Sequence, residues 1–189
     1  KGDKIVLVLD FLQLFLISKK NKEKILPDQI IDLIIEIIGK KGTLAFNSFS
    51  WDFLKKNYYN YKKTKSIGGA LSNRSLSRKD FKRTLHPIYS FSVYGKDSEK
   101  ICKIRSMDSF GLSSVFGYMI KNDYKYVSVG VPLNSGFAFV HVAEQEANVE
   151  YRYLKKFSGT YIDKRGKKTK KTCSMFVRKM NLSKGTRST

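Results

Sequence analysis

Runs of apolar residues divide the chain into segments with the periods of strands and helices. Residues 4–9 carry a continuous run of Ile, Val and Leu, which predicts a strand buried on both faces of a parallel sheet. Isoleucines in residues 27–38 form a wide apolar face behind Pro27 and Asp28, and this pattern predicts a helix that Gly39 ends. Residues 43–49 then predict a second strand. A strand, a helix and a strand within about 45 residues form a βαβ unit, so we expect an α/β sheet.

The rest of the chain predicts shorter elements and one long excursion. The patterns favour strands at 88–94 and at 126–131, the latter buried, helices at 98–104, 113–121 and 137–148, and a hairpin that pairs 151–161 with 170–178. Residues 51–83, rich in Tyr, Lys, Gly and Ser, predict a long surface loop. We therefore expect one domain over residues 1–189, a three-layer α/β/α fold with a mostly parallel or mixed central sheet plus a C-terminal β-hairpin.

The composition excludes disordered and membrane-spanning proteins. Hydrophobic residues make up 41% of the chain and aromatic residues 13%, which is far above the range of disordered proteins. The longest apolar run, residues 5–17, contains Asp10 and Gln13 and is too short to cross a bilayer. Cys102 and Cys173 lie far apart without a CxxC motif, so we expect no zinc or other metal, no disulfide framework, no membrane partner and a reducing, cytoplasmic location.

The charge indicates anionic partners without naming nucleic acid. The formal net charge is +21, and eight of the 37 basic residues are Arg while 29 are Lys. Proteins that read nucleic acids favour Arg, because its planar fork binds bases and phosphates through two hydrogen bonds. Scattered Lys gives a general positive field instead, so a nucleic-acid partner is disfavoured.

Two histidines are the candidate acids or bases. His141 and Glu144 are three residues apart in a predicted helix, so the carboxylate can orient the imidazole or support its protonated form. The alternative is a histidine that fills a pocket while Glu144 faces solvent. His86 precedes Pro87 in extended backbone, and by itself is more typical of a structural histidine. The chain has no GxSxG elbow and no glycine-rich phosphate loop, which disfavours hydrolases and NTPases.

Ordered motifs over residues 2–151 indicate a family. They are GDKIVLV from Gly2, GKKGTL from Gly39, SIGGAL from Ser66, RTLHPIYS from Arg83, FGLSSVFG from Phe110, and GVPLNS from Gly130 continuing to HVAE at His141. With these motifs the chain resembles the aminoglycoside 3-N-acetyltransferase family, enzymes that transfer an acetyl group from acetyl-CoA to an amine of a sugar. Members are longer, so the resemblance implies a chain shortened at both ends.

The resemblance also implies roles for individual residues. The implied catalytic residues are His141, Glu144 and His86. The implied acetyl-CoA contacts are Asp10, Phe11, Ser90, Ser113, Ser114 and Asn134, and the implied substrate contacts are Ser66, Gly69 and Arg83. The expected partners are acetyl-CoA and a small amino sugar.

Charge bears on which amino sugar is the acceptor. Aminoglycosides are polycations, which a protein of net charge +21 repels, so we expect a neutral or anionic amino sugar as the acceptor. Two other readings stay open: an inactive, truncated relative of the family, and a Lys-rich module that binds RNA or another polyanion.

Overall fold

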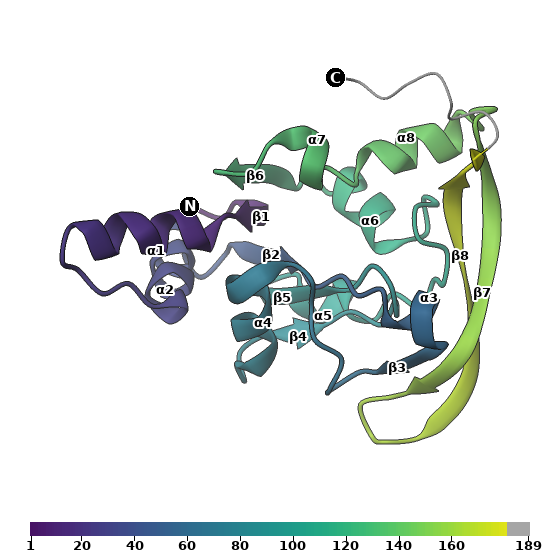
Figure 1. Ribbon diagram of the computed structural model, residues 1–189, viewed down its shortest axis with the longest axis horizontal. Helices are drawn as coiled ribbons and strands as arrows, with labels where there is room; N and C mark the ends of the chain where they lie inside the picture. Colours follow the sequence, from purple (N-terminus) through teal and green to yellow (C-terminus); the bar gives the residue numbers. More distant parts are fainter. Residues whose placement is uncertain (181–189) are drawn as a thin grey trace.

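A mixed five-stranded sheet forms the centre of the protein. The computed structural model describes residues 1–180, and its main sheet has the order β4-β5-β2-β1-β6. The strands are β1 (Lys4–Leu9), β2 (Thr43–Asn47), β4 (Lys82–Arg83), β5 (Phe91–Gly95) and β6 (Lys125–Val129). Strand β1 runs parallel to β2 and β6, while β5 is antiparallel to β2 and β4. The predicted parallel βαβ unit and mixed sheet are confirmed (Figure 1).

Helices cover both faces of this sheet. The helices are α1 (Phe11–Lys20), α2 (Pro27–Ile38), α4 (Gly69–Ser77), α5 (Ser98–Ile101), α6 (Val115–Lys121), α7 (Leu133–Gly136) and α8 (Val140–Glu146). Successive side chains of β1 point to opposite faces, so Ile5 and Leu7 join a cluster with Ile31 of α2, whereas Val6 joins a second cluster with Met119 of α6. Two separate cores on the two faces of one sheet make the three-layer α/β/α architecture.

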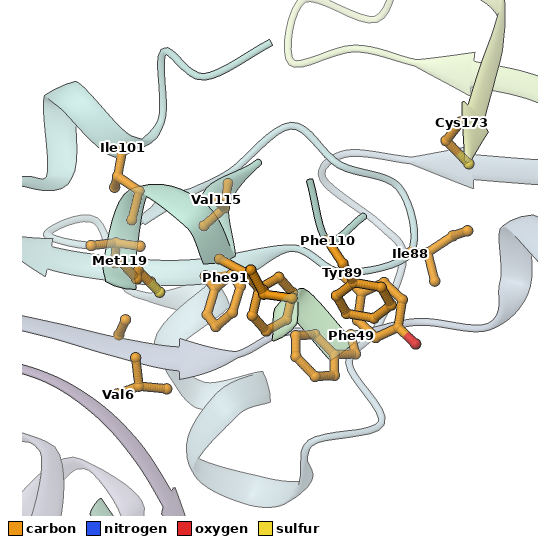
Figure 2. Packing of buried hydrophobic residues seen from close by; sticks show 14 of the residues in the cluster. Val6, Phe49, Ile88, Tyr89, Phe91, Ile101, Phe110, Val115, Met119 and Cys173 are labelled. Carbon is orange, nitrogen blue, oxygen red and sulfur yellow. The ribbon is translucent and has the colours of Figure 1, made fainter. Parts of the chain in front are cut away.

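Aromatic rings dominate the larger core. Figure 2 shows Phe49, Tyr89, Phe91 and Phe110 gathered beside α6. The ring centroids of Phe49 and Tyr89 are 4.9 Å apart, and those of Tyr89 and Phe110 are 4.8 Å apart. Tilted and edge-on rings at these distances add stabilisation beyond the area that they bury. The elements that surround the cavity described below pack against this cluster.

A second sheet lies beside the main one. It joins β3 (Tyr58–Asn60), β7 (Arg152–Ile162) and β8 (Lys168–Arg178), with β3 parallel to β7 and β7 antiparallel to β8. In Figure 1 the long hairpin of β7 and β8 stands along one side of the molecule. The Asp163 carboxylate accepts hydrogen bonds from the backbone N–H groups of Arg165 and Lys167 in the turn. The predicted C-terminal hairpin is confirmed.

The expected long surface loop at residues 51–83 is wrong. This segment contains α3 (Asp52–Lys56), β3, α4 and β4, and the side chains of Phe53, Tyr59 and Leu71 are buried. Tyr59 stacks on Tyr161 of β7 with the ring centroids 5.2 Å apart. The apolar residues are sparse along the sequence, but these three lie where neighbouring strands or helices cover them.

Three other expectations change in detail. Strand β6 is an edge strand and only half-buried, because β1 is its only neighbour in the sheet, so the expectation of a buried strand at 126–131 is wrong. The strand expected at 88–94 begins only at Phe91, because residues 86–89 form a turn around His86. The predicted helix at 137–148 is reduced to α8, while α1 was not predicted at all.

No helix within residues 1–180 is long and apolar enough to span a membrane.

Candidate active site

A cavity opens where β1 and β2 end. Its volume is about 360 Å³, and the last residues of both strands, Leu9 and Asn47, line it. The carboxyl ends of parallel strands are the usual place for a ligand in an open α/β sheet. Among the other lining residues are Trp51, Ile67, Gly68, Tyr89, Asn134, Phe137, Val140 and His141. Most of this lining is apolar, and His141 is the only ionisable imidazole in it.

His141 and Glu144 form a hydrogen-bonded pair at this cavity. Both belong to α8, and Nδ1 of His141 lies 2.5 Å from Oε2 of Glu144. The ring of Phe110 packs edge-on against the imidazole with the centroids 4.9 Å apart. The two side chains are 24% and 15% exposed, so the pair is largely shielded but reachable from the cavity. Because the carboxylate holds Nδ1, the nitrogen left to exchange a proton with a ligand is Nε2.

Two residues that the sequence analysis did not name hold Glu144. The hydroxyl of Tyr151 donates to Oε1 at 2.8 Å, and Nε of Arg152 forms an ion pair with Oε2 at 2.9 Å. Burial raises the pKa of Glu144, but the hydrogen bonds from His141 and Tyr151 and the charge of Arg152 outweigh it and hold the pKa below its ordinary value. Glu144 is therefore ionised when it orients His141. The sequence gives no sign of these contacts, because nothing in the local pattern of Tyr151 and Arg152 indicates that their side chains pack back against α8.

The hairpin fixes α8 through further contacts. Nε2 of Gln145 donates to the carboxylate of Asp108 at 2.7 Å, and residue 108 pairs with Ser174 of β8 in an isolated bridge. A terminal nitrogen of Arg152 also donates to the carbonyl of Phe176 at 3.1 Å. The second sheet thus supports α8 and the His141–Glu144 pair from behind.

His86 does not fit the catalytic role expected for it. It is buried, it does not line the cavity, and its Nδ1 accepts hydrogen bonds from the backbone N–H groups of Ile88 and Tyr89. Its Nε2 lies 3.3 Å from the carbonyl of Met107. Burial lowers the pKa of His86 to about 4, so the ring is neutral near neutral pH. The structure corrects this expectation: His86 shapes the turn before β5.

Arg83, Ser90 and Ser66 form a buried network instead of binding ligands in the cavity. Nε of Arg83 donates to the hydroxyl of Ser90, which itself donates to the carbonyl of Ser48 at 2.6 Å. The other guanidinium nitrogens donate to the carbonyls of Tyr61, Thr64 and Ser48. Ser66 lies behind the cavity wall, where its hydroxyl accepts from the N–H of Gly68. None of these three side chains lines the cavity, where the resemblance implied ligand contacts.

The remaining predicted contacts are spread over several elements. Asp10 accepts from the N–H groups of Leu12 and Gln13 and so caps α1, whose first residue is Phe11, and neither lines the cavity. Ser114 caps α6, and the hydroxyl of Ser113 lies 3.2 Å from that of Ser106. Gly69 begins α4 next to Gly68, which lines the cavity. Of the six predicted acetyl-CoA contacts, Asn134 lines the cavity.

The chemistry that this arrangement can perform is proton transfer. An imidazole with one nitrogen held by a carboxylate can accept a proton on the other and return it near neutral pH. Within the described part of the chain, no group of three or more His, Cys, Asp or Glu side chains could hold a metal ion.

Comparisons with solved structures agree with this fold. A sisomicin-bound AAC-VIa structure is 19% identical at a TM-score of 0.74, covering 94% of this chain and 70% of that one. A structure of AAC-IIIb in a binary complex with CoASH is 17% identical at a TM-score of 0.76, covering 93% of this chain and 70% of that one. YokD from Bacillus subtilis is 20% identical at a TM-score of 0.75, covering 96% of this chain and 78% of that one.

Sequence comparison identifies the family. Among curated proteins the comparison found no match. The family model for aminoglycoside 3-N-acetyltransferase matches residues 17–184, which is most of the chain. The shared fold agrees with this match. Several of the sequence motifs contribute lining residues to one cavity, among them Gly68, Asn134 and His141. The chain therefore belongs to the aminoglycoside 3-N-acetyltransferase family of acetyl-CoA-dependent enzymes.

Proposed function

We propose that His141 is the general base for transfer of an acetyl group from acetyl-CoA to an amine of a small amino sugar. The observation that carries this proposal is the His141–Glu144 pair at the wall of the cavity where β1 and β2 end. Acetyl-CoA supplies the acyl group as a thioester. Nε2 of His141 takes the proton from the attacking amine nitrogen and returns it to the sulfur that leaves the acetyl carbon. Glu144 is a positioning residue that keeps Nδ1 protonated and stabilises the charged ring.

The cavity lining supports a bound thioester and a sugar amine. Its apolar side chains, among them Ile67, Phe137 and Val140, exclude water from the reacting groups. Asn134 is the predicted acetyl-CoA contact that this lining contains, so we propose it as a polar contact of the co-substrate. The net charge of +21 favours capture of the CoA phosphates.

We also propose a cytoplasmic location. Cys102 and Cys173 are both free thiols, which suits a reducing compartment.

The variant His141→Gln tests the proposed base. The assay measures acetyl transfer to a panel of amino sugars through the CoA thiol that is released. The variant's kcat should fall about 100-fold or more, because an amide cannot accept the amine proton. Calorimetry should show unchanged affinity for acetyl-CoA, with ATP as a control for binding of any polyanion.

Glu144→Gln should lose less, on the order of tenfold in kcat, with KM nearly unchanged, because the residue acts through the imidazole. Full activity of His141→Gln would rule out the proposed base. Binding that ATP imitates and that salt abolishes would favour a polyanion-binding module instead.

A further inference from the structure

A second cavity lies against the edge strand β4. Its volume is about 540 Å³, and it shares no lining residue with the cavity at His141. Its walls come from β4, β5, α5 and the turn between β7 and β8. Its polar lining includes Lys62, Lys82, Arg83, Ser92, Lys103 and Lys164. We call it the β4 groove.

Cations outnumber carboxylates in the β4 groove. Four lysines and Arg83 line it, while Glu99 is the only carboxylate among its lining residues. Glu99 pairs with Lys82. The hydrogen bond from Lys82 and the charges of Lys103 and Lys164 lower the pKa of Glu99, so three lysines approach one carboxylate. Such a convergence of like charges is unfavourable unless an anion offsets it.

Arg83 adds a buried charge to the same wall. Its side chain is 5% exposed, and no carboxylate within residues 1–180 forms an ion pair with it. Its side chain donates hydrogen bonds to neutral oxygens, those of the Ser90 hydroxyl and three backbone carbonyls. Buried charges are normally paired with an opposite charge, whereas this one, beside the β4 groove, is offset only by neutral dipoles.

Ser92 supplies an unused polar group. Its side chain is fully buried, and its hydroxyl has no hydrogen-bond partner, although Ser92 lines the β4 groove. A buried hydroxyl without a partner costs free energy, and a ligand oxygen in the groove would satisfy it. This observation is independent of the charges and points to a polar ligand group next to β5.

We propose that the β4 groove binds the phosphate group of a small phosphorylated metabolite. Lysines bind phosphate as point charges, and a phosphate oxygen can accept a hydrogen bond from the Ser92 hydroxyl. Tyr61 and Leu85 line the same groove and offer an apolar wall to the rest of the ligand. A dianionic phosphate offsets the excess positive charge of the wall.

Calorimetry of the full chain with glucose 6-phosphate tests this site. Glucose is the neutral control, and inorganic phosphate tests whether the phosphate group alone is enough. The double variant Lys103→Gln with Lys164→Gln should weaken binding of glucose 6-phosphate about tenfold or more. Its matched control is Lys19→Gln with Lys40→Gln, which removes the same charge from two exposed lysines outside the groove and should leave the affinity within twofold.

Ser92→Ala is the second variant. Because the hydroxyl has no partner in the free protein, its removal should leave the melting temperature nearly unchanged. It should still weaken binding several-fold, since a hydrogen bond to the charged phosphate is lost. Inorganic phosphate that binds as well as glucose 6-phosphate would support a site for the phosphate group alone.

Three results would overturn the proposal. One is the absence of any binding of glucose 6-phosphate or phosphate. Another is an equal loss of affinity in the control double variant, which would mean that only the net charge matters. The third is preferential binding of an RNA oligonucleotide that competes with glucose 6-phosphate, which would make the groove part of a nucleic-acid surface.

Discussion

The two histidines of the chain differ in what surrounds their rings. One ring nitrogen of His141 is hydrogen-bonded to Glu144, and the ring borders a cavity. The ring of His86 is buried and hydrogen-bonded to backbone groups. The same side chain therefore borders a cavity with one ring nitrogen unbound by Glu144 at one position, and is a hydrogen-bonded part of a turn at the other. At the residue scale, burial and hydrogen-bond partners decide which role an imidazole has.

His86 should make stability depend on pH. Burial lowers its pKa to about 4 from the ordinary 6.5, so between these values the unfolded chain binds a proton that the folded chain does not. The free energy of unfolding should therefore be fully retained above pH 6.5 and fall as the pH drops towards 4, by roughly 3 kcal/mol from this residue.

Urea denaturation at several pH values measures this loss. The control is His86→Asn, whose side-chain oxygen can accept the N–H groups of Ile88 and Tyr89 without titrating. The variant should show a smaller loss between pH 6.5 and 4 than the wild type. Equal losses in both proteins would mean that His86 does not carry the effect.

The hairpin of β7 and β8 contacts two other parts of the protein. At its start, Tyr151 and Arg152 hold Glu144, and towards its turn it pairs with β3. The pairing needs a close approach of two backbones: a Cβ atom at Gly159 would lie 2.5 Å from the carbonyl oxygen of Asn57. Glycine at this position is thus what lets β7 join β3 and α3.

Gly159→Ala should destabilise the protein by about 1–3 kcal/mol, because the added methyl group meets backbone that cannot move aside cheaply. The midpoint of urea denaturation measures this change. Lys156→Ala, at an exposed position of the same strand, is the control and should change the midpoint little. If the two midpoints agree, the backbone approach at Gly159 does not require glycine.

At the scale of the whole molecule, charge bears on the choice of acceptor. The net charge is +21, and the residues that line the cavity at His141 include no Asp or Glu. Glu144 lies nearby, but it is already bound by His141, Tyr151 and Arg152. The described part of the chain thus offers a polycation little that would offset repulsion by the overall field.

We therefore propose a neutral or anionic amino sugar as the preferred acceptor. Steady-state kinetics should give UDP-linked amino sugars a kcat/KM at least about tenfold above that of gentamicin-class drugs, a ratio that narrows as salt screens the field. Higher kcat/KM values for the drugs would contradict this preference and favour an antibiotic as the acceptor.

Elements with a local sequence pattern could be predicted before the structure. The apolar run of β1, the isoleucine face of α2, and the helical spacing of His141 and Glu144 can each be read from residues close in the chain. The family could be predicted in the same way from short motifs, and the family model that matches residues 17–184 confirms it.

Which polar residues line the cavity depends on packing between segments far apart in the chain. Arg83, Ser90 and His86 belong to one sequence motif, but long-range partners such as Tyr61, Ser48 and Met107 occupy their polar atoms. Tyr151 and Arg152 meet Glu144 because the hairpin packs beside α8. A local pattern specifies which residues can bind or donate, whereas packing between distant segments determines which of them are left to do so.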